Sequence, residues 1–380
     1  MTLHLCFLSV KNLHTPKKCS TFAAKCEGTM ISDKLTQSQV EGVRRLLEPA
    51  KRVIILTHMS PDGDAMGSAL ALYWWLKDSK EAHVIVPNAF PDFFNWMPAV
   101  NDILICEKDA DKVQELISDA DLLICTDFNE PKRIGQLGQM VLDATSSKIL
   151  IDHHLFPSDF ADVTISYSDS PSASELVYRL IRQLGTTELS VELATCIYTG
   201  MMTDTGNFAF NSNHADMYRI VAHLVECGVD KDAVYNHIFN AHTEGRMRLV
   251  GYCLNNKMRI FPDRHAALIY LSGKELYRFH FKTGDAEGIV NMPMQIKDVY
   301  YSVFMREDKV AEWEQAQANG SKTKIKISMR SQGERPVNTF CHDIYNGGGH
   351  KNASGGEYYG TLTDAVDLFL KNYEKYFKKD

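Results

Sequence analysis

Four short fragments of this sequence carry acidic or imidazole side chains directly after an apolar segment. The most informative is KILIDHHLF, in which Asp152, His153 and His154 follow a run of aliphatic residues. In open α/β sheets the ligand site lies at the carboxyl ends of the strands, so side chains placed there can converge. The other fragments are THMSPDGDAMGS, LLICTDFNEPKRIG and YTGMMTDTGNFAF, which contribute His58, Asp62 and Asp64, then Asp127, and then Asp204.

The ligand atoms of this set would be imidazole nitrogens and carboxylate oxygens, with no thiolate. That mixture favours Mn²⁺, with Mg²⁺ or Co²⁺ as substitutes, over a structural Zn²⁺. Two such ions about 3.5–4 Å apart can clamp a phosphoryl group and convert a bridging water into hydroxide. We therefore predict a centre of two divalent metal ions that needs no Ser, Cys or Asp nucleophile.

Most of these fragments alone also have a plain structural explanation. SPDGD is typical of a surface turn shaped by Pro61 and Gly63, and a lone Asp127 would serve as a helix cap or loop acid. Two adjacent histidines after an acid, at the end of an apolar strand, have no obvious packing purpose. A metal centre accounts for all four fragments together.

The elements that must position these residues alternate between strands and helices. Strands are predicted over residues 51–57, 81–87, 101–107, 121–127 and 146–152. Helices are predicted over 32–50, capped by Ser32, and over 64–78, 109–119, 172–185 and 190–203. This order predicts an α/β fold with a doubly wound, mostly parallel sheet.

The C-terminal part of the sequence has a different pattern. Strands are predicted over 264–272, 298–307 and 322–331, helices over 337–346 and 363–377, and a polar surface insertion over 307–322. We expect a disordered extension over 1–29, a catalytic metal-binding domain over 30–212, a helical connector over 213–256 and a smaller α+β domain over 257–380.

Together the four fragments resemble the DHH phosphoesterase family over roughly residues 34–370. The resemblance implies that His58, Asp62 and Asp127 hold one metal ion. It implies that Asp64, Asp127, His153 and Asp204 hold the other, so that Asp127 bridges the two. Asp152 would orient its neighbour, as is common for a ligating histidine, and His154 would face the substrate phosphate as a hydrogen-bond donor or acid.

A glycine-rich segment near the C-terminus supplies a second group of candidates. NGGGHKNASGG contains Gly347, Gly348 and Gly349, which could expose backbone N–H groups as an anion nest, followed by His350 and Lys351, which add charge. One short helix earlier, KISMRS supplies Arg330, able to bind phosphate bidentately, and Ser331. The pairing is similar to the DHH-associated C-terminal domain and implies a nucleotide-binding role.

Three further features are open to two interpretations each. Arg133 is either a substrate contact or a solvated charge at a helix start. Phe208 and Phe210 could stack on a base, but core packing is the preferred interpretation for both. Core packing is also preferred for Trp74 and Trp75.

Composition excludes several classes of protein. The chain has 380 residues, 44% hydrophobic and 23% charged, as expected of a soluble globular protein. A net charge of -7 argues against a generic duplex-binding protein. The nine cysteines form no CxxC pair, which argues against a zinc ribbon and indicates reduced thiols in a cytoplasmic protein. No stretch reaches transmembrane length, so no membrane partner is expected.

The leading hypothesis is a Mn²⁺-dependent hydrolase that converts short single-stranded RNA to mononucleotides and removes the 3′-phosphate of pAp. The resemblance to the oligoribonuclease and pAp phosphatase group within the family implies this function. The alternative enzymatic hypothesis is cleavage of cyclic or linear dinucleotides. A catalytically silent nucleotide-binding protein and an inorganic pyrophosphatase are the remaining rivals, and a homodimer stays an open expectation.

Overall fold

The computed structural model describes residues 31–308 and 323–377. The extension expected over residues 1–29 and most of the polar insertion expected over 307–322 lie outside the described residues. Within the described part, the chain forms two six-stranded sheets, each covered by helices. No described helix combines the length and the apolar character that crossing a membrane requires.

The first sheet is parallel at every pair of neighbouring strands, in the order β3-β2-β1-β4-β5-β6. This confirms the predicted α/β architecture. The strand predicted over 101–107 is present as β3 but has only two residues, and the strand β6 was not predicted. The strands are β1 (Arg52–Leu56), β2 (Glu81–Val86), β3 (Leu104–Ile105), β4 (Leu122–Thr126), β5 (Ser147–Asp152) and β6 (Val163–Ser166).

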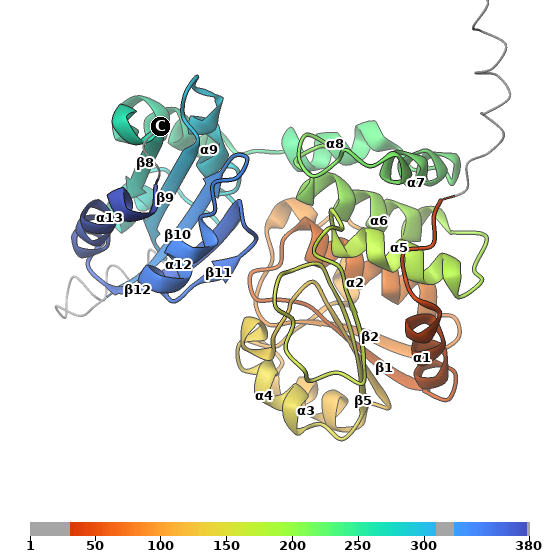
Figure 1. Cartoon of the computed structure of the whole chain (residues 1–380). Coiled ribbons are helices and arrows are strands. Elements are labelled where there is room, and N and C mark those ends of the chain that lie inside the picture. The colour runs from red at the N-terminus through yellow and green to blue at the C-terminus, as the bar shows by residue number, and fades with distance from the viewer. Residues whose placement is uncertain (1–30, 309–322, 378–380) are drawn as a thin grey trace, which may run out of the picture.

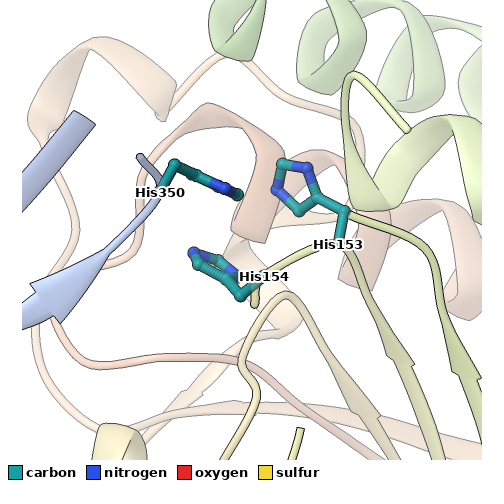
Figure 2. A group of neighbouring side chains, drawn as sticks. All are labelled: His153, His154 and His350. Carbon is teal, nitrogen blue, oxygen red and sulfur yellow. The ribbon is translucent and has the colours of Figure 1, made fainter. Parts of the chain in front are cut away.

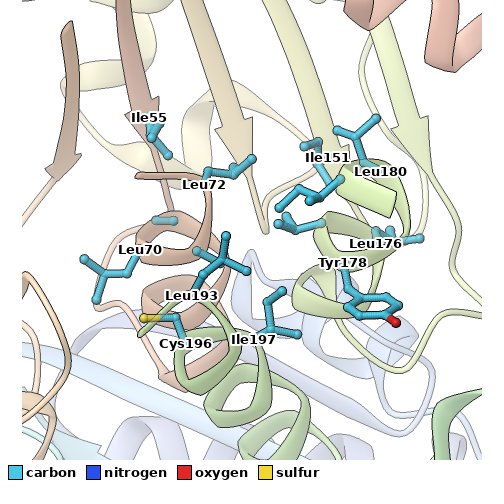
Figure 3. Close-up of a cluster of buried hydrophobic side chains, with 14 of the residues drawn as sticks. Ile55, Leu70, Leu72, Ile151, Leu176, Tyr178, Leu180, Leu193, Cys196 and Ile197 are labelled. Carbon is cyan, nitrogen blue, oxygen red and sulfur yellow. The ribbon is translucent and has the colours of Figure 1, made fainter. Parts of the chain in front are cut away.

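Helices cover both faces of this sheet, which explains why its central strands are buried, nearly continuous apolar runs. Successive residues of a strand point to opposite faces of the sheet, so Ile55 packs in one hydrophobic core and Ile54 in another. Figure 3 shows the larger core, between the sheet and the helices α2, α5 and α6. The helices are α1 (Gln37–Leu47), α2 (Gly63–Leu76), α5 (Ala173–Gln183) and α6 (Val191–Asp204) on that face, and α3 (Ala110–Ser118) and α4 (Leu137–Asp143) on the other.

Two details of the helices correct or support the sequence analysis. Helix α1 begins later than expected: its cap is Thr36, which forms a reciprocal capping box with Gln39, and not Ser32. Trp74 and Trp75 pack against the larger core, as expected. Their indole N–H groups donate to the carbonyl of Pro98 at 3.2 Å and to the hydroxyl of Thr186 at 3.0 Å.

The second sheet is mixed, in the order β11-β12-β10-β9-β8-β7, with β8 and β9 parallel and the other pairs antiparallel. The predicted strands and helices of this region are present, but β7, β11, β12 and α10 were not predicted. The elements are β7 (Arg259–Phe261), β8 (Ala266–Leu271), α10 (Gly273–Arg278), β9 (Tyr301–Glu307), β10 (Thr323–Ser331), α12 (Asn338–Tyr345), β11 (Gly348–Gly349), β12 (Ala353–Gly360) and α13 (Leu362–Tyr376).

The region expected as a connector contains three helices, α7 (Ala215–Glu226), α8 (Lys231–Phe239) and α9 (Glu244–Tyr252). Helices α7 and α8 add Ile220 and Val234 to the core of the first sheet, whereas α9 adds Leu249 to a core of the second sheet. In Figure 1 α7 and α8 lie over α6, and a single segment after α8 leads to the second sheet. We propose that the two domains divide between α8 and α9.

Candidate metal centre

The candidate residues of the first domain meet at one edge of the parallel sheet. His58 follows β1, Asp127 follows β4 and Asp152 ends β5, and these strands are neighbours. Asp64 lies in the first turn of α2, and Asp204 is the last residue of α6. The carboxyl ends of parallel strands share one edge, so residues far apart in sequence become neighbours.

Asp127 lies between two groups of ligand atoms. Its Oδ2 is 3.4 Å from Nε2 of His58, and its Oδ1 is 3.3 Å from Nε2 of His153. The residue is 2% exposed, its φ of 64° is left-handed, and among the described residues Oδ1 has no hydrogen-bond partner. A buried oxygen without a hydrogen bond is open to a cation, and backbone strain of this kind is concentrated at functional sites.

Among the described residues, four groups of three side chains each bring their ligand atoms within 4.8 Å of one another, and two of these sets consist only of the six candidate ligands. The members of each set are residues that the family resemblance implied for one ion, and Asp127, a member of the first set, also faces the second. The sets are His58, Asp62 and Asp127, and Asp64, His153 and Asp204.

The carboxylate of Asp64 is crowded by negative charge. Burial, together with the carboxylates of Asp127 and Asp204, raises the pKa of Asp64 well above its usual range. The two oxygens of Asp64 accept backbone N–H groups of Ala173 at 2.6 Å and Ser174 at 2.9 Å, which fixes the side chain at the start of α5. A divalent cation among these acids would relieve their repulsion.

The histidines His58 and His153 are oriented by backbone carbonyls. Nδ1 of His58 donates to the carbonyl of Met59 at 3.0 Å, and Nδ1 of His153 donates to that of Ser170 at 3.2 Å. Each Nε2 is thereby turned toward the carboxylates, an arrangement typical of metal-ligating histidines. Burial would lower the pKa of His58, but Asp62 and Asp127 outweigh it and raise the pKa to about 10.

A third histidine group joins the two domains. Asp152 holds His154, accepting from Nδ1 at 2.8 Å and from the backbone N–H at 3.0 Å. His350 of the second domain stacks on His154, with ring centroids 4.4 Å apart and planes 16° from parallel, and lies 4.7 Å from the ring of His153. Figure 2 shows His350 approaching His153 and His154 from a separate segment of the chain.

This geometry agrees with a known family. The sequence profile described as the DHH family, N-terminal domain, matches residues 52–201, which contain five of the six candidate ligands. The chain belongs to the DHH family. It is therefore a hydrolase.

Several relatives extend the comparison beyond the matched region. The crystal structure of an exopolyphosphatase-related protein from Bacteroides fragilis has 45% identity and a TM-score of 0.83, covering 91% of this chain and 98% of its own. A Thermus thermophilus protein named bifunctional oligoribonuclease and PAP phosphatase NrnA is 28% identical over 80% of this chain and 83% of its own. The fold is shared with RecJ of Thermus thermophilus, solved with Mn²⁺, at 11% identity and a TM-score of 0.51, covering 92% of this chain and 56% of RecJ.

The glycine segment of this DHH chain is not the open anion nest that the sequence suggested. Gly347 donates its N–H to the carbonyl of Cys341 at 2.9 Å, and Gly348 and Gly349 pair with β12 as the short strand β11. A Cβ on Gly347 would lie 1.9 Å from the carbonyl oxygen of Gly355, so glycine is required by close backbone approach. The segment is an edge strand that positions His350.

The two residues expected to add charge at this segment have different surroundings. The ammonium of Lys351 pairs with Glu334, and this contact lies within the second domain. Burial and the facing imidazoles of His153 and His154 lower the pKa of His350 to about 2. His350 therefore contributes a neutral ring at ordinary pH, and the ammonium of Lys351 lies in an exposed ion pair with Glu334.

Arg330 and Ser331 point in opposite directions, because neighbouring residues of a strand face opposite sides of the sheet. The Ser331 hydroxyl donates to the carbonyl of Arg335 and accepts from Nδ2 of Asn352 at 2.9 Å, so it is occupied within the domain. Arg330 lies on the face of β10 shared with the half-buried Ser328, and its charge acts on Asp204 of the first domain. Arg330 alone of this pair faces the candidate site.

Arg133 and the two phenylalanines take different positions. The carbonyl of Arg133 accepts the N–H of Met59 at 2.9 Å, next to His58, and its charge acts on His350, so Arg133 lies beside the site. Phe208 packs against the core beside Tyr198, as expected. Phe210 is 54% exposed, so the expectation of core packing is wrong for this residue.

Glu287 and Arg246 also lie near the candidate site and were not predicted from the sequence. Arg246 of α9 is buried and donates from Nη2 to the carbonyl of Glu287 at 2.7 Å. Desolvation by the surrounding protein, together with the carboxylate of Asp62, raises the pKa of Glu287 to about 7. The second domain thus brings an acid toward the first ligand set, from a loop, GDAEG, that carries no strand signal in the sequence.

Proposed function

We propose that this chain is a Mn²⁺-dependent phosphoesterase that hydrolyses short RNA oligonucleotides to mononucleotides and removes the 3′-phosphate of pAp. The observation that carries the proposal is the position of Asp127, whose two oxygens face two different sets of ligands. A shared carboxylate of this kind supports two metal ions held close together. The name of the Thermus thermophilus relative supports the substrate class, and RecJ solved with Mn²⁺ supports the ion.

The first ion would be held by His58, Asp62 and Asp127, and the second by Asp64, Asp127, His153 and Asp204. The residues fit such ions, because the ligand atoms converge and Oδ1 of Asp127 is buried without a hydrogen bond. When bound, the two ions supply Lewis acidity toward the phosphoryl oxygens and lower the pKa of the attacking water.

His154 has a separate task in this proposal. Burial lowers its pKa, so the ring is neutral, with the proton on Nδ1 held by Asp152. An arriving phosphate would favour the imidazolium form, in which Nε2–H donates to a phosphoryl oxygen while Asp152 stabilises the positive charge. His154 would then be able to protonate the ribose oxygen that leaves.

The second domain would hold the nucleotide. Arg330 and His350 extend toward the metal ligands from β10 and from the end of β11. A guanidinium offers two parallel N–H groups to a phosphate, and a neutral imidazole offers one hydrogen bond without repelling the metal ions. A substrate a few nucleotides long could therefore contact both domains at once.

The test is a matched panel hydrolysed by the full chain with Mn²⁺. It contains a 5′-phosphorylated RNA dinucleotide, a five-nucleotide RNA, pAp, cyclic di-AMP, pyrophosphate and a short polyphosphate. Cleavage of the RNA oligomers and pAp, with pyrophosphate and polyphosphate spared, is the expected result. Preference for cyclic di-AMP would replace the proposal by cyclic-dinucleotide turnover, and preference for polyphosphate would replace it by the activity that the name of the Bacteroides fragilis relative suggests.

A further inference from the structure

The turn that follows Asp204 has an unusual backbone. Gly206, Asn207 and Phe208 are three consecutive residues with left-handed φ values of 56°, 58° and 61°. For residues with a side chain this region is unfavourable by roughly 1–2 kcal/mol each, so such a run persists only where its surroundings hold it. Strain of this kind is concentrated at functional sites, and this turn directly follows a candidate metal ligand.

The turn is held by Thr205 and by the core. The Thr205 hydroxyl donates to the carbonyl of Met201 at 2.6 Å and accepts the N–H of Phe208 at 3.0 Å. The backbone carbonyl of Thr205 accepts the N–H groups of Ala209 and Phe210, both at 2.9 Å. The ring of Phe208 packs against Tyr198, with centroids 5.7 Å apart. The turn therefore has one defined conformation anchored in the protein interior.

This anchored turn presents one aromatic ring to solvent. Phe210 is 54% exposed, and its ring lies over Gly206, where a Cβ would come within 2.8 Å of Cδ2. Gly206 is two residues from Asp204, so their Cα atoms are at most about 7.6 Å apart. An exposed aromatic ring is thus held against a residue only two positions from the candidate ligand Asp204.

We propose that Phe210 is a specificity-determining residue that stacks on a nucleobase of the substrate next to the scissile phosphate. This inference rests on the proposed function, because it requires a substrate with bases. Every base has a π-face, so stacking is tolerant of sequence and suits an enzyme that accepts varied short oligonucleotides. Pyrophosphate and polyphosphate have no ring and gain nothing from this surface.

The experiment compares the wild type with Phe210→Ala, Phe210→Trp and the control Tyr218→Ala. Tyr218 of α7 is 50% exposed, close to the exposure of Phe210, and has no place in the candidate site. Each protein hydrolyses two substrates with Mn²⁺: a 5′-phosphorylated RNA dinucleotide and the same molecule with both bases replaced by hydrogen. KM and kcat are measured separately, and thermal melting checks that the variants fold.

For Phe210→Ala we expect KM for the dinucleotide to rise about tenfold with kcat within about twofold, the loss of one stacked base. Phe210→Trp should restore KM, Tyr218→Ala should match the wild type, and the substrate without bases should not distinguish Phe210→Ala from the wild type. An unchanged KM, or an equal loss on both substrates, overturns the inference while the proposed function stands. If the wild type cleaves no dinucleotide, the proposed function and this inference fail together.

Discussion

At the scale of single residues, Asp127 is the position on which the candidate site depends. It is buried, strained, and close to one histidine through each of its oxygens. In the proposed centre, replacing this side chain would remove an oxygen ligand, or its negative charge, from both ligand sets. No other described residue faces both sets in this way.

Asp127→Asn should lower kcat/KM for the dinucleotide by more than about 100-fold and reduce the bound Mn²⁺, since the amide removes a negative charge shared by both ions. Activity assays and elemental analysis of the dialysed protein measure the two effects. Asp143→Asn is the control, because Asp143 is exposed at the end of α4, where it accepts from Gln139. Full metal content in Asp127→Asn would contradict the ligand assignment.

Mn²⁺ binding should also depend on pH. The pKa of His58 is raised to about 10, so its ring is protonated between about pH 6 and 8. Because a ligating histidine must be neutral, Mn²⁺ binding has to displace this proton. Raising the pH makes that displacement easier, so affinity should increase about tenfold per pH unit for each proton released. Calorimetric titrations in two buffers with different ionisation enthalpies count the protons, and a pH-independent affinity would exclude this coupling.

At the scale of elements, the close crossing of α2 and α6 brings Asp64 and Asp204 together. A Cβ on Gly67 would lie 2.6 Å from the carbonyl oxygen of Cys196, and a backbone cannot move aside as a side chain can. Glycine at this crossing is therefore a requirement of the site as well as of the fold.

Gly67→Ala should lower the free energy of unfolding by about 1–3 kcal/mol and weaken Mn²⁺ binding, because the helices that carry two ligands must separate. Gly251→Ala in α9 is the matched control: no atom lies within 4 Å of its added Cβ, so alanine should raise stability by about 0.5–1 kcal/mol. Urea unfolding measures both. Equal stabilities would show that the two helices can part without loss.

The pattern of apolar and polar residues predicted the strands and helices of the first domain well. It failed for segments in which that pattern is weak. His58, Asp127 and Asp152 could be placed together because each lies at or just after the carboxyl end of a buried parallel strand, where ligand sites of such sheets lie. Strand β12, ASGGEYYG, was missed because its glycines remove the alternation that marks a strand. The opposite facing of Ser331 relative to Arg330 was available from strand period alone, whereas nothing in GDAEG points to Glu287.

At the scale of the whole molecule, the second domain places His350 over His154, and we propose that this ring completes the site. His350→Ala should lower kcat/KM for the dinucleotide by about 100-fold while leaving the bound Mn²⁺ and the melting temperature unchanged. Lys351→Ala is the neighbouring control, because its ammonium pairs with Glu334, and it should behave as the wild type. Similar losses in both variants would indicate a general disturbance of the segment instead.

The shared carboxylate of Asp127 has a consequence for how the protein fills with metal. In the proposed centre one side chain would serve both positions, so occupancy of either would change the charge and geometry offered to the other. By thermodynamic linkage the effect is reciprocal: the factor by which the first ion alters the affinity of the second is the factor by which the second alters the first. A titration with Mn²⁺ should therefore not fit a model of two independent sites. The coupling free energy between the two positions measures the effect of the shared carboxylate of Asp127.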